Sequence, residues 1–256
     1  MRLVVVALAV VVALAAGCGA TQTRDAEQTP ESTTPATAPP AATTTVAGTT
    51  PTVAEQRTTL QLYFLAQDGQ LVAATRDVEH TPAPGGAALR ELTNPPEGAT
   101  TQVPDGLHLA IDQGKADVTG ATLDDAALAQ VVYTLTSFPT VQTVNGKTRK
   151  DVEDFVPAIL VDDPSPGEPV TSPLRATGTA NTFEATFSYS LKDATGNEIA
   201  HDFVTATSGT GERGTFDFTA PFTVDIAQDG TLAVFELSAE DGSVIHERRI
   251  PLRLEP

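Results

Sequence analysis

The sequence predicts an α+β protein in which a small α/β sandwich is followed by an antiparallel β-sandwich. Three observations support this fold class. Strand and helix patterns alternate over residues 58–150, only strand patterns follow over residues 157–256, and residues 18–57 hold almost no large apolar side chain. Interleaved elements favour a mixed domain, whereas short strands separated by turn residues favour two packed sheets.

The chain begins with an unbroken apolar run, residues 3–16, that leads through Gly17 to the only cysteine, Cys18. About 14 apolar residues are too few for a membrane-spanning helix, which needs roughly 20, but they fit the apolar part of a secretory signal. The small residues before Cys18 resemble the lipobox of a bacterial lipoprotein. That resemblance implies removal of residues 1–17 and a lipid anchor on Cys18. A generic cleaved signal that leaves a free thiol is the alternative.

Residues 18–57 are dominated by threonine, alanine and proline. Such a segment cannot bury enough apolar surface to offset the entropy of ordering it, so we expect a disordered tether. Its prolines favour extended polyproline II stretches of about 3.1 Å per residue. A tether of this kind would hold the folded part away from the membrane or pass through cell wall.

The overall charge excludes several classes of partner. The chain has 33 acidic and 15 basic residues, a formal net charge of −18. Such a protein repels phosphate backbones, so no nucleic-acid partner is expected. It also repels anionic headgroups, so we expect membrane contact through the lipid on Cys18 and not through a basic patch. With one cysteine, neither an internal disulfide nor a cysteine-based metal site is expected.

Residues 58–150 predict five strands and two helices. The expected strands are residues 59–65, 71–78, 107–112, 116–119 and 141–144, and the expected helices are residues 87–92 and a longer one that begins after Thr122. Thr122 is the predicted cap of this longer helix, and Asp124 and Asp125 fall in its first turn, where the helix dipole favours carboxylates. Its apolar positions recur at spacings of three and four, at Leu128, Val131, Val132, Leu135 and Phe138. Pro139 is expected to end it.

Residues 157–256 predict strands only. The expected strands are residues 159–161, 174–179, 182–191, 198–207, 214–219, 231–238 and 245–254, separated by turns that contain Gly, Pro or Asp. About seven short strands in about 100 residues favour a β-sandwich of immunoglobulin type. Because the Cys–Trp–Cys core of antibody domains is absent, phenylalanines are expected in its core: Phe183, Phe187, Phe203, Phe216, Phe218 and Phe235.

Short motifs in both regions resemble two known families. The first set is Leu62-Tyr63-Phe64-Leu65, Val103-Pro104-Asp105-Gly106 and Gln130-Val131-Val132-Tyr133-Thr134-Leu135-Thr136-Ser137-Phe138-Pro139. It resembles the GerMN domain of sporulation and spore germination proteins. The second set is Pro164-Ser165-Pro166-Gly167, Ser172-Pro173, Gly178-Thr179-Ala180, Phe183-Glu184-Ala185, Arg213-Gly214 and Glu236-Leu237-Ser238-Ala239-Glu240-Asp241-Gly242. It resembles the immunoglobulin-like domain of bacterial spore germination.

The resemblance implies a non-catalytic lipoprotein of the cell envelope, and it assigns no catalytic residue. GerMN domains also occur in envelope lipoproteins linked to two-component sensor kinases. The expected localisation is therefore the extracytoplasmic face of the cell membrane.

A search for chemistry yields weak candidates. Residues 209–214 match G-x-G-x-x-G, but a strand pattern follows where a nucleotide site needs a helix, so a hairpin loop or bulge is the favoured interpretation. There is no G-x-S-x-G elbow for a nucleophilic serine. We therefore expect no cofactor and no catalytic residue.

Metal-binding patterns are equally sparse. The four histidines, His80, His108, His201 and His246, form no i, i+4 pair. Asp162 and Asp163 could offer oxygen ligands to Ca²⁺ together with Glu168, but EF-hand spacing is absent. No metal is therefore predicted.

These observations predict a non-catalytic, lipid-anchored binding or scaffold protein whose partner is an envelope protein or peptidoglycan. Residues 162–172 and 208–214 are its candidate binding loops, because sandwich domains bind through edges and end loops. Two alternatives are a cell-wall enzyme that uses acidic residues of the first domain and a regulator of a membrane sensor kinase.

Overall fold

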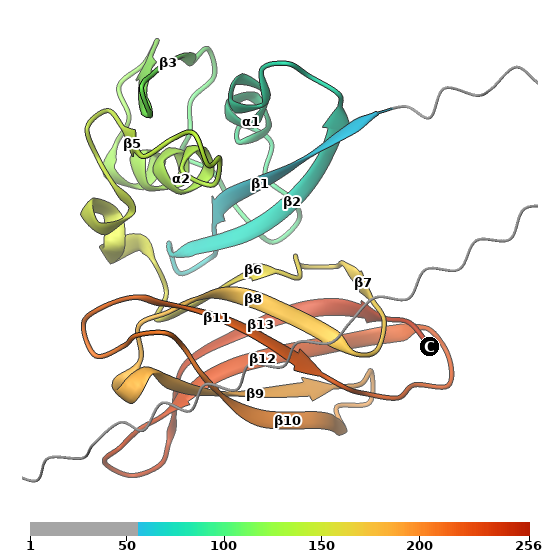
Figure 1. Ribbon diagram of the computed structural model, residues 1–256. Coiled ribbons are helices and arrows are strands. Elements are labelled where there is room, and N and C mark those ends of the chain that lie inside the picture. Colours follow the sequence, from blue (N-terminus) through green and yellow to red (C-terminus); the bar gives the residue numbers. More distant parts are fainter. Residues whose placement is uncertain (1–55) are drawn as a thin grey trace, which may run out of the picture. The chain divides into compact units, whose positions relative to one another are not determined.

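The computed structural model describes residues 56–256 (Figure 1). The chain divides into two units, residues 1–51 and 52–256. The predicted signal peptide, Cys18 and nearly all of the predicted tether therefore lie outside the described residues. Within residues 56–256, no helix is both long enough and apolar enough to cross a membrane.

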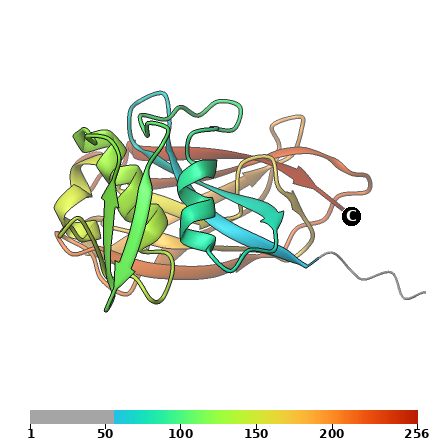
Figure 2. The ribbon, with the colours of Figure 1, turned by 90° about the horizontal axis from the view of Figure 1, so that it is seen from above.

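The first domain contains two small sheets and two helices. Its elements are β1 (Arg57–Leu65), β2 (Leu71–Glu79), α1 (Pro84–Glu91), β3 (His108–Asp112), β4 (Lys115–Thr119), α2 (Asp125–Leu135) and β5 (Thr143–Val144). β1 and β2 form an antiparallel hairpin with nine consecutive residue pairs, and β3, β4 and β5 form the second sheet. Both helices pack against β1, and Figure 2 shows them from above.

β1 supplies the centre of this core. Leu60, Leu62, Tyr63 and Phe64 on this strand are at most 1% exposed. Successive side chains of a strand point to opposite faces. Both faces of the C-terminal end of β1 are therefore covered. Leu160 of the second domain belongs to the same buried cluster, which shows that the second domain contributes to covering it.

The longer helix begins and ends slightly differently from the prediction. Its N-cap is Asp124, whose Oδ1 accepts a hydrogen bond from the Ala127 N–H at 2.7 Å, so the prediction of Thr122 as the cap is wrong. A carboxylate cap both pairs a free N–H and complements the helix dipole. The helix ends at Leu135, before Pro139, because the Thr136 hydroxyl donates to the Val132 carbonyl and completes the last turn.

The second domain is a sandwich of two sheets. A 3-10 helix, η1 (Arg149–Phe155), leads into β6 (Ile159–Asp163), β7 (Pro169–Val170), β8 (Leu174–Ala180), the short 3-10 turn η2 (Phe183–Ala185), β9 (Thr186–Lys192), β10 (Glu198–Thr205), β11 (Gly214–Ala220), β12 (Gln228–Leu237) and β13 (Val244–Leu254). One sheet has the order β10-β9-β12-β13-β7 and the other the order β11-β8-β6. The predicted fold class, α+β with an immunoglobulin-like sandwich, is confirmed.

The aromatic core of the sandwich differs in part from the predicted set. Phe187 and Phe216 are buried, with ring centroids 4.9 Å apart. The prediction that Phe183 and Phe203 belong to the core is wrong, because their side chains are 54% and 68% exposed. Phe183 lies in η2, so the strand expected from residue 182 begins only at Thr186.

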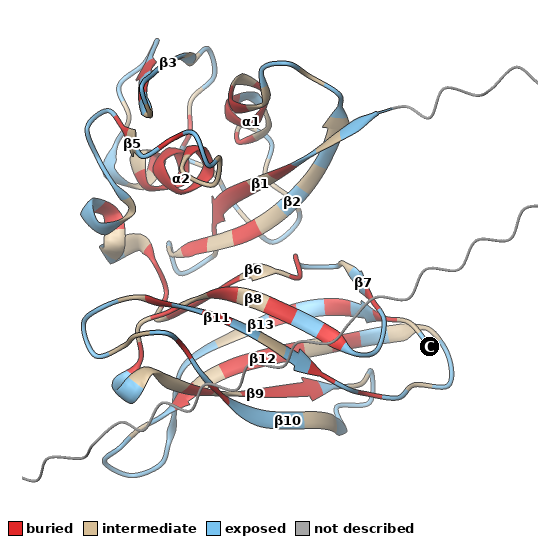
Figure 3. Ribbon diagram, viewed as in Figure 1, coloured by how far each residue is buried: buried red, intermediate tan, exposed pale blue. Residues whose placement is uncertain are grey.

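Phe203 is an exposed residue of β10, next to the buried Val204. Figure 3 shows that most of β10 is exposed or half-buried. Two aromatic side chains outside the predicted set, Tyr189 and Phe222, are buried instead, each 6% exposed. Phe218 and Phe235 are half-buried.

Candidate binding cleft at the domain junction

Hydrogen bonds between side chains join the two domains along a seam, which we define as the contact of β1 and β2 with residues 160–166. The Tyr63 hydroxyl donates to Asp162 Oδ1 at 2.8 Å, and Gln61 Nε2 donates to the Asp162 carbonyl at 3.1 Å. The Thr75 N–H donates to Ser165 Oγ at 2.8 Å. The start of the candidate binding loop 162–172 is therefore engaged within the protein itself.

The carboxyl of Asp162 lies in a poorly solvated position. Burial raises the pKa of Asp162, although the Tyr63 hydroxyl, Arg149 and Arg213 all act in the opposite direction. Burial also raises the pKa of Tyr63, and the nearby Asp162 carboxyl adds to that effect. Tyr63 therefore stays protonated and can donate its hydrogen bond to Asp162.

The structure does not assemble the calcium ligands considered from the sequence. Glu168 Oε2 accepts from the Ser165 N–H at 2.9 Å, while Asp162 is hydrogen-bonded to Tyr63. Within residues 56–256, no three His, Cys, Asp or Glu side chains gather closely enough to hold a metal ion.

Arg149, at the start of η1, lies over two tyrosine rings. Its Cζ is 4.5 Å from the ring centroid of Tyr133 and 5.7 Å from that of Tyr63, within the range of cation–π attraction. Its Nε donates to Thr136 Oγ1 at 2.9 Å and its Nη2 donates to the Tyr133 carbonyl at 3.1 Å. These contacts fix η1 against the end of α2.

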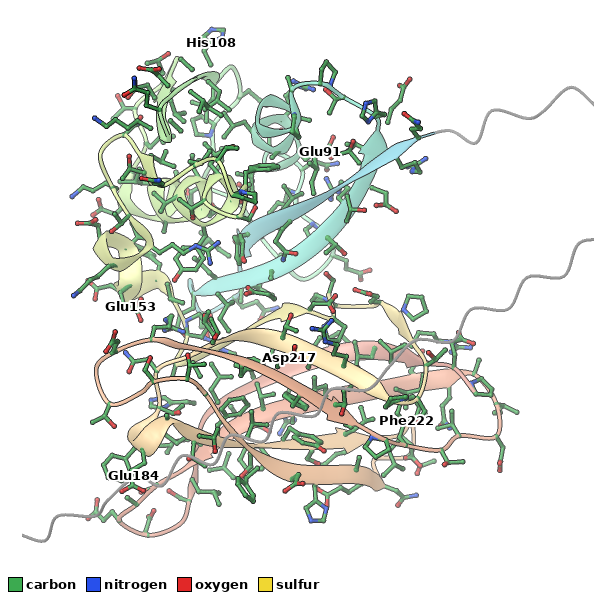
Figure 4. All side chains as sticks on the ribbon, in the orientation of Figure 1. Glu91, His108, Glu153, Glu184, Asp217 and Phe222 are labelled. Carbon is green, nitrogen blue, oxygen red and sulfur yellow. The ribbon has the colours of Figure 1, made fainter. Side chains whose placement is uncertain are left out.

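Arg213 links the loop of residues 208–214 to η1 and to the segment that follows it. Its Nε donates to Glu153 Oε1 of η1 at 2.7 Å, and its Nη2 donates to the Pro157 carbonyl at 2.9 Å. With 13% of its side chain exposed, this guanidinium is largely enclosed. Figure 4 labels Glu153 on η1.

The glycines of residues 209–214 shape this loop and do not open a helix. A Cβ on Gly209 would lie 2.5 Å from the Ala185 backbone, and one on Gly214 would collide with the Ser208 backbone. The strand β11 follows directly at Gly214. The loop therefore lacks the helix N-terminus that a nucleotide phosphate requires.

These residues enclose a cleft of about 780 Å³, which we call the junction cleft. Its lining comes from the first domain, from η1 and from the sandwich: Tyr133, Arg149, Lys150, Glu153, Thr179, Asn181, Gly211, Glu212 and Arg213. The volume falls within the range of about 300–1,000 Å³ that is usual for small-ligand sites.

One lining residue has an unusual polar atom. Tyr133 is 1% exposed, and its hydroxyl has no hydrogen-bond partner within residues 56–256. Burial raises the pKa of Tyr133 to about 12, so the hydroxyl carries its proton at neutral pH. A buried polar group without a partner costs about 1–3 kcal/mol, so its presence in a cleft wall needs an explanation.

Of the two candidate binding loops, residues 208–214 line the junction cleft, whereas residues 162–166 lie at the seam. Sequence reasoning missed Tyr133, Arg149 and Lys150. The cluster of basic residues at 147–150 in a strongly acidic chain was a usable signal for two of them.

The remaining candidates do not converge on the junction cleft. His201 and His246 each lie 2.9 Å from a glutamate, Glu198 and Glu236 respectively. Figure 4 shows His108 at the end of the first domain that is remote from Glu153. Asp124, which was expected in the first turn of the helix, is instead the cap of α2.

Comparison with known proteins identifies both domains. Residues 61–145 match the family model described as sporulation and spore germination, and residues 158–243 match the model of the immunoglobulin-like domain of bacterial spore germination. No curated protein matches the chain.

Among solved structures, CopC from Methylosinus trichosporium OB3b is similar at 19% identity over 38% of this chain and 94% of that chain, with a TM-score of 0.26. The tandem GerMN domains of the sporulation protein GerM from Bacillus subtilis are similar at 17% identity over 58% of this chain and 60% of that chain, with a TM-score of 0.33. Likenesses this distant carry no argument about the site. The two family matches show that this chain joins a sporulation and spore germination domain to an immunoglobulin-like domain of bacterial spore germination.

Proposed function

We propose that this chain is a non-catalytic binding protein of the cell envelope, in which the two domains act together as one recognition module. The observation that supports this most directly is the composition of the junction cleft, whose lining comes from both domains. Neither domain alone would form it. The hydrogen bonds of the seam hold the two halves of the lining in register.

The placement of the acidic residues favours binding over catalysis. An enzyme that cleaves glycans needs two carboxyl groups facing each other across the substrate, one as an acid and one as a base or nucleophile. Of the two acidic residues that line the junction cleft, Glu153 is ion-paired with Arg213, so Glu212 is the one exposed carboxyl there, and outside the cleft Asp124 caps a helix. Neither of the two family descriptions names an enzymatic activity.

The proposed location rests on the sequence before the described part. A lipid on Cys18 would anchor the chain at the extracytoplasmic face of the cell membrane, and residues 18–57 would carry the two domains toward the cell wall. The proposed partner is peptidoglycan or an envelope protein. The two family matches support a role related to sporulation or germination, and envelope signalling is a further part of the proposal.

The anchor is tested by fractionation of cells that make the full chain or its Cys18→Ala variant. The wild-type chain should sediment with membranes, and the variant should appear in the medium. A variant that stays in the membrane fraction would refute the anchor.

The binding role is tested by proximity labelling from a tag after Pro256, with a protein that carries only the lipid anchor as the control. Enrichment of cell-wall glycan or an envelope protein over that control supports the role, and enrichment of neither contradicts it. Co-purification of a histidine kinase as the main product would favour the regulator alternative.

A further inference from the structure

The junction cleft has a local charge opposite to that of the whole chain. Its lining includes three basic side chains, Arg149, Lys150 and Arg213, and two acidic ones, Glu153 and Glu212. The chain as a whole has 33 acidic and only 15 basic residues. A cationic cleft in an anionic protein attracts a ligand that the rest of the surface repels.

Most of the unpaired groups in the cleft are hydrogen-bond donors. Within residues 56–256, neither the Lys150 ammonium nor Arg149 Nη1 has a hydrogen-bond or ion-pair partner. The Tyr133 hydroxyl is also without a partner there. Asn181 accepts from the Gly211 N–H through Oδ1, which leaves its amide nitrogen free to donate. Converging donors call for a ligand rich in acceptor oxygens.

The arrangement favours a carboxylate on a peptide over a phosphate. Guanidinium and ammonium groups bind either anion. Glu212, however, is exposed at the same cleft and offers an acceptor for an amine or amide N–H, a donor that a peptide has and an inorganic phosphate lacks. The amide of Asn181 likewise complements a peptide group. A ligand with carboxylates and N–H donors within a few ångströms of each other is a short peptide.

We propose that the junction cleft binds the carboxylate-bearing peptide of peptidoglycan. The carboxylate would lie against Lys150 and Arg149, and an acceptor oxygen of the ligand would supply the missing partner of the Tyr133 hydroxyl. This assignment rests on the proposed envelope-binding function and names the ligand of the same site.

Two variants test the assignment in the full chain, held in detergent, by calorimetric titration with a soluble muropeptide. Lys150→Glu reverses the charge of an exposed side chain that makes no internal contact, and it should weaken binding by about tenfold or more. Tyr133→Phe removes only the unpartnered hydroxyl, and it should weaken binding about three- to tenfold. The midpoint of thermal unfolding of Tyr133→Phe should stay the same or rise. A variant that lost binding because its fold was damaged would instead show a lower midpoint.

The matched control is Lys192→Glu on β9, which makes the same charge change at an exposed lysine outside the cleft and should leave binding unchanged. The matched probe is the muropeptide with its carboxylates amidated, which should bind at least about tenfold more weakly. Equal affinity of Lys150→Glu and wild type, or of the amidated and native muropeptides, would overturn the assignment. Competition by inorganic phosphate at concentrations as low as those of the muropeptide would also overturn it and indicate a phosphate site.

The outcome is separable from that of the proposed function. If the muropeptide fails to bind while proximity labelling still enriches an envelope protein, the peptide assignment fails and the binding role stands. If neither experiment yields a partner, both fail.

Discussion

Tyr63 and Tyr133 are buried side by side, but their hydroxyl groups differ in hydrogen bonding. Their ring centroids are 5.2 Å apart, and the same guanidinium, that of Arg149, lies over both rings. The Tyr63 hydroxyl donates to Asp162, whereas the Tyr133 hydroxyl has no partner within the described part of the chain. The first hydroxyl closes the seam between the domains, and the second belongs to a residue that lines the junction cleft. The difference separates a hydroxyl that joins the two domains from one that we propose to meet a ligand.

The position of each tyrosine explains the difference. Tyr63 is on β1, whose end is covered by the second domain, so its hydroxyl meets Asp162 of β6 directly. Tyr133 is near the end of α2 and lines the junction cleft together with η1 and the 208–214 loop.

The largest expected effect comes from removing the Tyr63 side chain. Tyr63→Ala deletes a large, fully buried side chain and leaves Asp162 without its donor, so the free energy of unfolding should fall by about 3–5 kcal/mol. Urea unfolding followed by circular dichroism measures this. Phe203→Ala, at a 68% exposed aromatic, should change stability by less than about 0.5 kcal/mol. Equal losses in the two variants would contradict the burial described for the seam.

A direct test of the comparison removes one hydroxyl at a time. Tyr63→Phe leaves the buried Asp162 carboxyl without its hydrogen bond and should cost about 1–3 kcal/mol in the free energy of unfolding. Tyr133→Phe removes a hydroxyl that has no partner among residues 56–256, so stability should stay the same or increase. The same urea titrations compare the two. A larger loss in Tyr133→Phe than in Tyr63→Phe would reverse the assignment of the two roles.

The pH dependence of stability tests which protonation state of Asp162 the folded protein favours. Burial raises the pKa of Asp162 above its ordinary value of 3.8, so the folded protein holds this proton more tightly than the unfolded chain does. The stability contributed by the protonated form is therefore present at low pH and is lost as the pH rises through the raised pKa. Asp162→Asn keeps an oxygen acceptor for Tyr63 but has no proton to lose.

The measurement is the free energy of unfolding of both proteins between about pH 4 and pH 7. Wild type should lose stability relative to Asp162→Asn as the pH rises. A gain of wild type over the variant in that window would mean that the ionised carboxylate is the favoured form, held by Arg149 and Arg213.

The smallest effect is expected at an ion pair outside the seam, between β13 and the turn that joins β1 to β2. Arg248 Nη1 of β13 lies 2.6 Å from Asp68 Oδ2 in the β1–β2 turn, and Arg248 Nη2 also contacts Gln70. Because the Asp68 side chain is 51% exposed, Arg248→Ala should cost only about 0.2–1 kcal/mol, and the loss should shrink at high salt.

Arg175→Ala is the control for that salt dependence, because Arg175 and Asp217 form an exposed pair within the sandwich, away from the seam. Its effect should be no larger than that of Arg248→Ala. A loss of several kcal/mol for Arg248→Ala would show that this ion pair is as important to stability as Tyr63 is at the seam.

Local patterns allowed most elements to be predicted. The turn at Asp68-Gly69 has the positive φ at Gly69 that the sequence signals, and Asn145-Gly146 has positive φ at both residues. Between these turns, alternation of apolar residues located nearly every strand. The two-residue strand β7 was missed, because its pairing with the end of β13 is set by tertiary contact and not by a local pattern.

The junction cleft was harder to predict, because it depends on contacts between distant residues. Arg149 and Arg213 lie in different domains and line the same cleft only because Glu153 and the Pro157 carbonyl hold the 208–214 loop. Whether Phe203 points inward or outward depends on the register of β10, which the sequence pattern did not reveal. A buried hydroxyl without a partner, as in Tyr133, has no sequence signature at all.

The hairpin of β1 and β2 also has a mechanical consequence. In the proposed arrangement, with a tether before residue 56 and a ligand held in the junction cleft, the chain would be pulled from both ends. Tension would enter at residue 56 and pass along β1 through Tyr63 to Tyr133, because the two tyrosine rings are in contact. A pull in that direction shears the nine residue pairs of the hairpin together, so they share the tension instead of opening one after another.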